Sequence, residues 1–148
     1  MYRQTLLALV ATAAAVLVAT PASAQVNAYK VAPSQLSDYW VRTTMHVDVS
    51  VPNGGQGLKA VGCASVSYLI GANGNTYNVK VEKVYPKTSD FSLMAKTFVQ
   101  GLHYAPTDSN THDMPVATYF IVPFNVPTGD KAALEHVLKQ CHLPGYGD

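Results

Sequence analysis

The chain has 148 residues, of which 13% are charged and 48% are hydrophobic, and its formal net charge is +1. A near-neutral chain without clusters of Lys and Arg is not suited to nucleic acid, and it offers no basic patch to an anionic membrane surface. Its length suits one domain with a modest core.

The first 24 residues have the pattern of a secretory signal peptide. A weakly basic start containing Arg3 precedes an apolar run at 6–18, and Ala22-Ser-Ala24 provides a small-x-small cleavage motif before Gln25. We therefore expect a periplasmic protein without residues 1–24, which leaves 124 residues (148 − 24) and equal numbers of basic (10 − 1) and acidic (9) side chains. The run is short for a membrane span, but an uncleaved inner-membrane anchor facing the periplasm stays an alternative.

Residues 25–61 form a lead-in to the main domain. The segment 34–42 predicts one or two helical turns with Ser34 as the N-cap. Met45–Val51 alternates apolar and polar residues, which predicts an additional strand. The Gly-rich segment 52–57 then predicts a turn.

The stretch 62–126 carries the clearest pattern of the chain. Every second residue from Ala64 to Ile70 is apolar or aromatic, as in a strand with one buried face. The turn residues of 71–74 and a renewed alternation at 77–81 predict a β-hairpin. A helix is expected at 89–101, ended by Gly101 in left-handed geometry, and its apolar stripe would comprise Phe91, Leu93, Met94 and Phe98.

A last apolar strand is predicted at 115–126, and a C-terminal helical extension follows at 127–148. Its helix, 128–140, has an apolar stripe and an N-cap at Thr128 or Asp130. The stripe comprises Ala133, Leu134, Val137 and Leu138.

The two cysteines, Cys63 and Cys141, both lie in the exported part. An even number of cysteines in an oxidising compartment favours a disulfide, which would stabilise the fold by roughly 4 kcal/mol on the chain-entropy argument. Two buried free thiols or a metal site are the alternatives. His136, Cys141 and His142 lie close in sequence, but their spacing matches no standard zinc arrangement, so we expect no metal.

The order of motifs in 62–126 resembles the C-terminal domain of TonB-family energy transducers. It departs from the family in lacking a Ser-Ser-Gly after the second strand, a Leu-Asp at the helix start and a Tyr-Pro run before the first strand. The matching motifs are Gly62, the alternating strand 64–70, Gly74, Val79 and Val81, the helical segment 93–99, Tyr104-Ala105-Pro106, Pro115-Val116 and Pro123-Phe124.

The resemblance implies an α+β fold, with an antiparallel sheet of three or four strands, a helix packed on one face and an added C-terminal helix. It also implies strand addition, in which a segment of an envelope or outer-membrane protein, such as a TonB-dependent receptor, pairs with an exposed sheet edge. The prolines at 115 and 123 suit an edge strand. The expected binding residues are Val116, Thr118, Tyr119, Ile121 and Val122.

The function expected from the sequence is therefore non-catalytic protein recognition. The chain shows no nucleophile motif such as Gly-x-Ser-x-Gly, and Gly71-x-x-Gly74 joins two strands, so it is no phosphate loop. Neither an enzyme activity nor a small-molecule cofactor is expected, and a homodimer stays open. The cleavable signal and the missing spacer favour a stand-alone domain. The alternatives are an anchored energy transducer and a small periplasmic enzyme or metal-binding protein.

Overall fold

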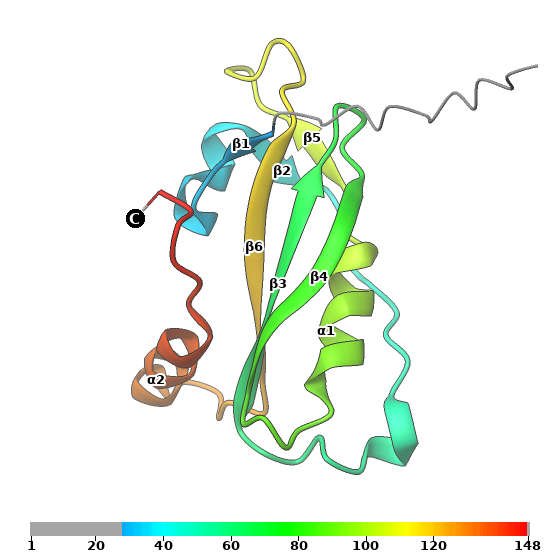
Figure 1. Ribbon diagram of the computed structural model, residues 1–148, viewed down its shortest axis with the longest axis vertical. Helices are drawn as coiled ribbons and strands as arrows, with labels where there is room; N and C mark the ends of the chain where they lie inside the picture. The colour runs from blue at the N-terminus through cyan, green and yellow to red at the C-terminus, as the bar shows by residue number, and fades with distance from the viewer. Residues whose placement is uncertain (1–27, 148) are drawn as a thin grey trace, which may run out of the picture.

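The computed structural model describes residues 28–147 and shows an α+β fold (Figure 1). The signal-peptide prediction for residues 1–24 lies outside the described residues. One sheet has the strand order β1-β6-β3-β4, and β2 and β5 form a second sheet. In chain order the elements are β1 (Tyr29–Lys30), the 3-10 helix η1 (Pro33–Asp38), β2 (Trp40–Arg42), the short helical turn η2 (Pro52–Gly55), β3 (Gly62–Ile70), β4 (Thr76–Tyr85), α1 (Phe91–Gln100), β5 (Tyr104–Pro106), β6 (Val116–Phe124) and α2 (Lys131–Cys141).

The predicted hairpin is present as β3 and β4, and β3 pairs antiparallel with β6 on its other side. Gly74 in the turn has a φ of 75°, and a Cβ there would collide with the backbone carbonyl oxygen of Tyr104. Glycine is therefore required at this position on two grounds. The predicted buried face of β3 is confirmed, since its alternating residues Ala64, Val66, Tyr68 and Ile70 are all buried.

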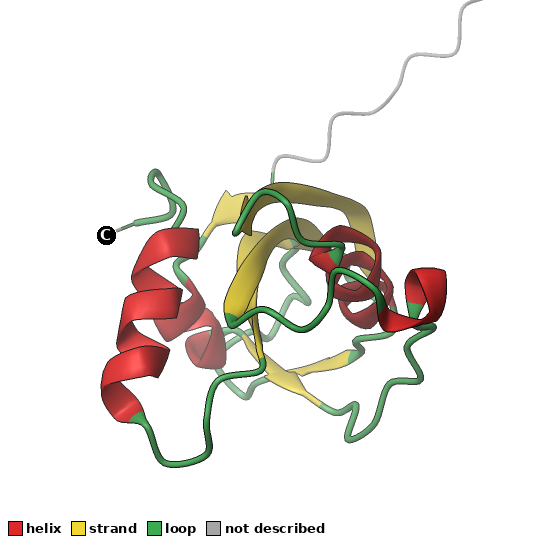
Figure 2. Ribbon diagram, turned by 90° about the horizontal axis from the view of Figure 1, so that it is seen from below, coloured by secondary structure: helices red, strands yellow, loops and turns green. Residues whose placement is uncertain are grey.

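The two helices cover opposite faces of the sheet (Figure 2). Because α2 packs on the second face, Cys63 and Ser65 of β3 are also fully buried, and only Ser67 and Leu69 are half-buried on that side. The expectation of a single buried face is thus wrong for the first half of β3. The added helix changes the burial of a strand whose own pattern indicates one apolar face.

Helix α1 lies within the predicted segment 89–101, but it buries a different stripe. Its fully buried residues are Phe91, Ala95 and Val99, whereas Leu93 is 52% exposed. The expected left-handed ending is wrong, since Gly101 has a φ of −87°. Glycine suits this position for another reason, because an added Cβ would lie 2.6 Å from a methyl group of Val47.

The lead-in differs most from the prediction. Residues 45–51 form no strand, Met45 is 97% exposed, and Val47 packs against the core beside Gly101. The fourth strand of the main sheet is instead β1, which pairs parallel with β6 and makes the sheet mixed. Helix η1 begins at Pro33 without the expected Ser34 cap.

Helix α2 begins after Asp130, whose carboxylate accepts a hydrogen bond from the Ala133 backbone N–H at 2.9 Å, which confirms the predicted N-cap. Its buried residues are Val137 and Cys141. Cys141 forms the expected disulfide with Cys63, with a Cα–Cα distance of 6.2 Å. Within residues 28–147, no helix is long and apolar enough to cross a membrane.

Candidate functional site

The outer edge of β6 already holds a short strand of the same chain. The pairing of β1 with β6 is parallel, with Tyr29 opposite Val116 and Lys30 opposite Ala117. The Val31 backbone N–H donates to the Ala117 carbonyl at 2.9 Å, and the Thr118 hydroxyl donates to the Val31 carbonyl at 2.8 Å. This edge therefore accepts an extended segment in parallel orientation.

The covering strand stops because Pro33 follows two residues after Val31. A proline has no backbone N–H, so it cannot donate the next bond of this ladder, and it begins η1 instead. The chain leaves the β6 edge at this point (Figure 1). The edge beyond Ala117 is therefore not continued by β1.

Ile121 is the β6 residue that this departure leaves open. Alternate residues of a paired strand direct their backbone groups to opposite sides. The backbone groups of Ala117 face away from β3, because its carbonyl accepts a bond from Val31. Ile121 is four residues further along β6, so its backbone groups face the same way as those of Ala117. No backbone or side-chain group within residues 28–147 forms a hydrogen bond with the Ile121 N–H or C=O. Two residues further on, Pro123 can offer only a carbonyl.

The predicted binding residues have three different surroundings. Val116 and Thr118 are fully buried beneath β1 and in the core, and Tyr119 is 3% exposed. Ile121 and Val122 are half-buried. The prediction that this strand forms the sheet edge is therefore wrong at its start, because β1 occupies the edge at Val116 and Ala117.

The C-terminal tail lies on the α2 face of the same strand. The Tyr119 ring contacts Tyr146, with 5.0 Å between ring centroids, and it also contacts the His142 ring. The Lys30 Nζ lies 5.5 Å from the Tyr146 ring centroid, which is within the range of a cation–π contact. The tail therefore supports β1 and β6 from the face opposite α1.

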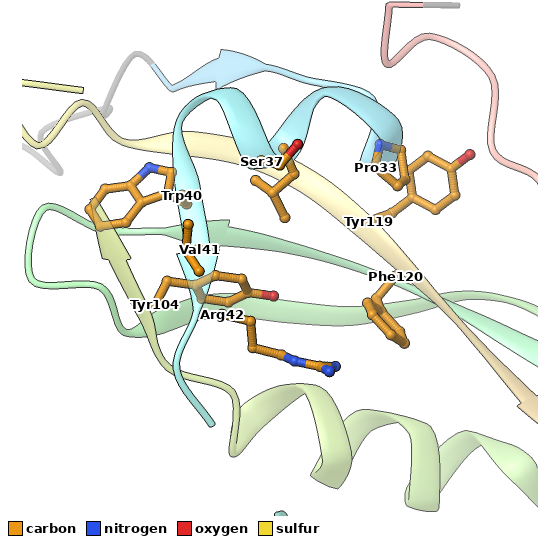
Figure 3. Close-up of a pocket in the computed structure, with 9 residues that line it drawn as sticks. Pro33, Ser37, Trp40, Val41, Arg42, Tyr104, Tyr119 and Phe120 are labelled. Carbon is orange, nitrogen blue, oxygen red and sulfur yellow. The ribbon is translucent and has the colours of Figure 1, made fainter. Parts of the chain in front are cut away.

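A pocket of about 480 Å³ adjoins the opposite, α1 face of β6 (Figure 3). Its walls come from η1, β2, β5 and β6, and they are mainly apolar. Figure 3 shows the Arg42 side chain reaching into this space between Tyr104 and Phe120. The lining residues are Pro33, Leu36, Ser37, Trp40, Val41, Arg42, Tyr104, Tyr119 and Phe120.

One wall of the pocket is fixed by a pair of buried hydroxyl groups. The Tyr68 and Tyr104 hydroxyl oxygens lie 2.7 Å apart. Burial raises the pKa of Tyr68 well above 10.0 and raises the pKa of Tyr104, while the Arg42 charge opposes both shifts. Both hydroxyls therefore stay neutral at physiological pH, and one of them donates its proton to the other, which leaves one O–H for a further acceptor. The indole of Trp40 is held by its own bond to the Met114 carbonyl at 3.0 Å.

Sequence reasoning missed this pocket. Trp40 and Arg42 lie in the segment expected to be helical, and the sequence indicates Tyr104 only as part of an aromatic-x-Pro motif. The pocket depends on the β2–β5 pairing, in which Arg42 lies opposite Tyr104 across 62 residues of chain (104 − 42). The available signal is the pair of aromatic residues at 39–40, which indicates burial of this segment without indicating its partner.

The opposite edge of the sheet, β4, is built to resist pairing. Lys80, Glu82 and Lys83 are exposed along it, and its register shifts twice against β3. The Glu82 carboxylate accepts bonds from the Ser67 hydroxyl at 2.8 Å and from the Lys80 ammonium at 3.0 Å, and these bonds lower its pKa. Charged side chains and bulges discourage strand addition. Between the two edges, β6 is the one suited to a partner.

The histidines and cysteines do not assemble into a metal site in the part of the chain that the structure describes. Cys141 is in the disulfide, the His136 ring contacts Tyr85, and the His142 ring contacts Tyr119. His103 shares a hydrogen bond with the Asn75 side chain at 2.9 Å.

The chain is similar in structure to a domain of known fold. No protein-family model matches the chain, and no curated protein matches it. The solution NMR structure of the Pseudomonas aeruginosa TonB C-terminal domain aligns with a TM-score of 0.47 and 15% sequence identity. The alignment covers 67% of this chain and 96% of that chain.

Proposed function

We infer that this chain is a non-catalytic recognition domain of the periplasm, which binds an extended segment of an envelope or outer-membrane protein by strand addition at β6. The observation that carries this proposal is the edge itself: it accepts β1 in parallel, and beyond Pro33 the Ile121 backbone groups have no partner within the described residues. The order of motifs between Gly62 and Phe124 supports the same proposal. Export by removal of residues 1–24 would place the domain in the periplasm.

The open stretch of this edge is short, which bears on the affinity. A partner can pair with the two backbone groups of Ile121 and with the Pro123 carbonyl. At about 1 kcal/mol net for each hydrogen bond, these contribute about 3 kcal/mol, whereas a Kd of about 1 mM requires about 4 kcal/mol. Backbone pairing alone is therefore too weak, so side-chain contacts beside the edge must contribute.

The first prediction tests the edge with Ile121→Pro. The substitution removes the Ile121 N–H, which bonds to no described residue, so the sheet should stay folded while partner binding is lost. The measurement is capture of envelope proteins by the immobilised exported protein, with thermal unfolding of the variant recorded in parallel.

The matched control is Ile121→Val, because the Ile121 side chain also packs against the disulfide cluster. This variant keeps the N–H and shortens the side chain by one methylene, so it should capture the same proteins as the wild type. A folded Ile121→Pro variant that captures its partners normally would exclude strand addition at this edge.

A further inference from the structure

The pocket lies where the side chains of an added strand would point. Val31 directly follows β1 and still bonds to β6, and it directs its side chain into the core on the α1 face, where it is 1% exposed. Side chains alternate along a strand, so in a parallel segment that continues this ladder every second side chain faces α1. At the level of Ile121, the surface on that side is the pocket beside Phe120.

The pocket carries a single formal charge, that of Arg42. Within residues 28–147 its guanidinium makes no ion pair and no hydrogen bond, although it lies among apolar and aromatic walls. The Ser37 hydroxyl adds a neutral donor to the lining, and the Tyr104 hydroxyl adds another when it accepts from Tyr68. A guanidinium in a largely apolar site matches a carboxylate, which can accept two parallel hydrogen bonds from it.

We propose that this pocket selects an acidic side chain, Asp or Glu, in the segment that pairs with β6, and that Arg42 is the residue that binds its carboxylate. A volume of about 480 Å³ exceeds that of one carboxylate. The next side chain on the same face, two residues away, is therefore a large apolar one that fills the space against Trp40 and Leu36. This inference rests on the proposed strand addition and names the partner's chemistry.

The probe is a library of random short peptides displayed on phage and selected on the full exported protein. We expect the selected peptides to share a β-prone pattern with an acidic residue at a fixed position and an apolar residue two positions away. Trp40 is the sole tryptophan of the chain and lines the pocket, so its fluorescence reports the binding of synthetic peptides directly.

A double-mutant cycle then tests the contact between Arg42 and the acid. Arg42 is exposed to solvent on one side, so Arg42→Gln should weaken binding of the acidic peptide only about fivefold. Changing the peptide's acidic residue to its amide should weaken binding to the wild type by the same factor and should leave binding to the Arg42→Gln variant unchanged. The reason is that both changes remove the same interaction. Arg42→Lys keeps the charge and should retain part of the affinity.

Two outcomes overturn the inference, and they are distinguishable. If selected peptides lose binding to Ile121→Pro but show additive effects of Arg42→Gln and the acid-to-amide change, strand addition stands and the acidic specificity is wrong. If no peptide is selected, or if the peptides bind Ile121→Pro as well as wild type, both the proposed function and this inference fall.

Discussion

Tyr68 and Tyr104 show how single buried hydroxyls stabilise the core beside the candidate site. Their hydroxyl oxygens lie 2.7 Å apart, and Tyr68 is 3% exposed. A buried hydroxyl without a hydrogen-bond partner would destabilise the fold by about 1–3 kcal/mol. Each of the two tyrosine hydroxyls is the hydrogen-bond partner of the other and so removes this cost. Alternation along β3 predicts that Tyr68 is buried, but it cannot identify Tyr104 as its partner.

The second prediction concerns stability at high pH. Burial raises the pKa of Tyr68 well above 10.0, so its stabilising contribution is complete below about pH 10. Above that pH the unfolded chain releases a proton that the folded chain retains, and the free energy of unfolding falls until the folded pKa is passed. Urea unfolding between neutral pH and pH 11 should show this fall, and Tyr68→Phe should make it shallower. A Tyr68→Phe variant with an equally steep alkaline fall would contradict the assignment.

At the scale of elements, Pro33 and Asp130 set where two segments begin and end. Pro33 terminates the β1 ladder and starts η1, which exposes the remaining β6 edge. Asp130 starts α2, the helix that covers the second face of the sheet. Both signals are local and can be recognised in sequence, although the consequence of Pro33 depends on the strand beside it.

The third prediction tests the α2 cap. Asp130→Ala removes the hydrogen bond to the Ala133 N–H and should lower the free energy of unfolding by about 1 kcal/mol. Asp130→Asn is the matched control, because asparagine is an equally good N-cap, and it should stay within a few tenths of a kcal/mol of wild type. Equal loss in both variants would indicate that charge, and not the cap, is responsible.

At the scale of the whole molecule, the disulfide joins the C-terminal helix α2 to the start of the central strand β3. Cys63 and Cys141 are separated by 78 residues, and both are fully buried together with Val137. The bond links α2 to the first residues of β3 on the face opposite α1. The packing of α2 against Ile121 and Val126 adds to this link.

The fourth prediction is that the double variant Cys63→Ala/Cys141→Ala loses about 4 kcal/mol of stability, because the unfolded chain is no longer constrained. Since a small apolar cluster and the hydrogen bonds from the Ser65 hydroxyl to the Cys141 carbonyl and from the Lys83 ammonium to the His142 carbonyl then hold α2, its amides should exchange with solvent before those of β3. Urea unfolding and hydrogen exchange are the measurements. Unchanged protection of α2 in the double variant would show that the helix is held without the disulfide.

The fifth prediction concerns maturation of the exported chain. Ala22-Ser-Ala24 and the short apolar run before it predict cleavage before Gln25. The intact mass of periplasmic protein should therefore lack residues 1–24. A membrane fraction that retains Met1 would instead support an anchored protein and the energy-transducer alternative.

Local patterns in the sequence determined three of the four strands of the main sheet, β3, β4 and β6, and both α-helices. The alternation in 64–70, the turn at 71–74, the Asp130 cap and the even cysteine pair all found their counterparts in the structure. These features depend on interactions within a few residues, or on two cysteines without competitors. The same local reasoning failed at 45–51, where the alternating pattern has no strand to pair with.

The tertiary structure decided which edge is open and what lies beside it. A two-residue strand such as β1 has too few residues to show periodicity, and the pocket brings together Trp40, Arg42, Tyr104 and Phe120 from three separate strands, β2, β5 and β6. Strand order and pocket shape depend on contacts between residues that are distant in the chain. Such contacts cannot be inferred from the residue pattern of either segment alone. The sequence by itself thus determined β3, β4, β6 and both α-helices and indicated Ile121 as a binding residue, whereas only the packing decided that the edge is covered by β1 up to Ala117 and that Arg42 lies beside it.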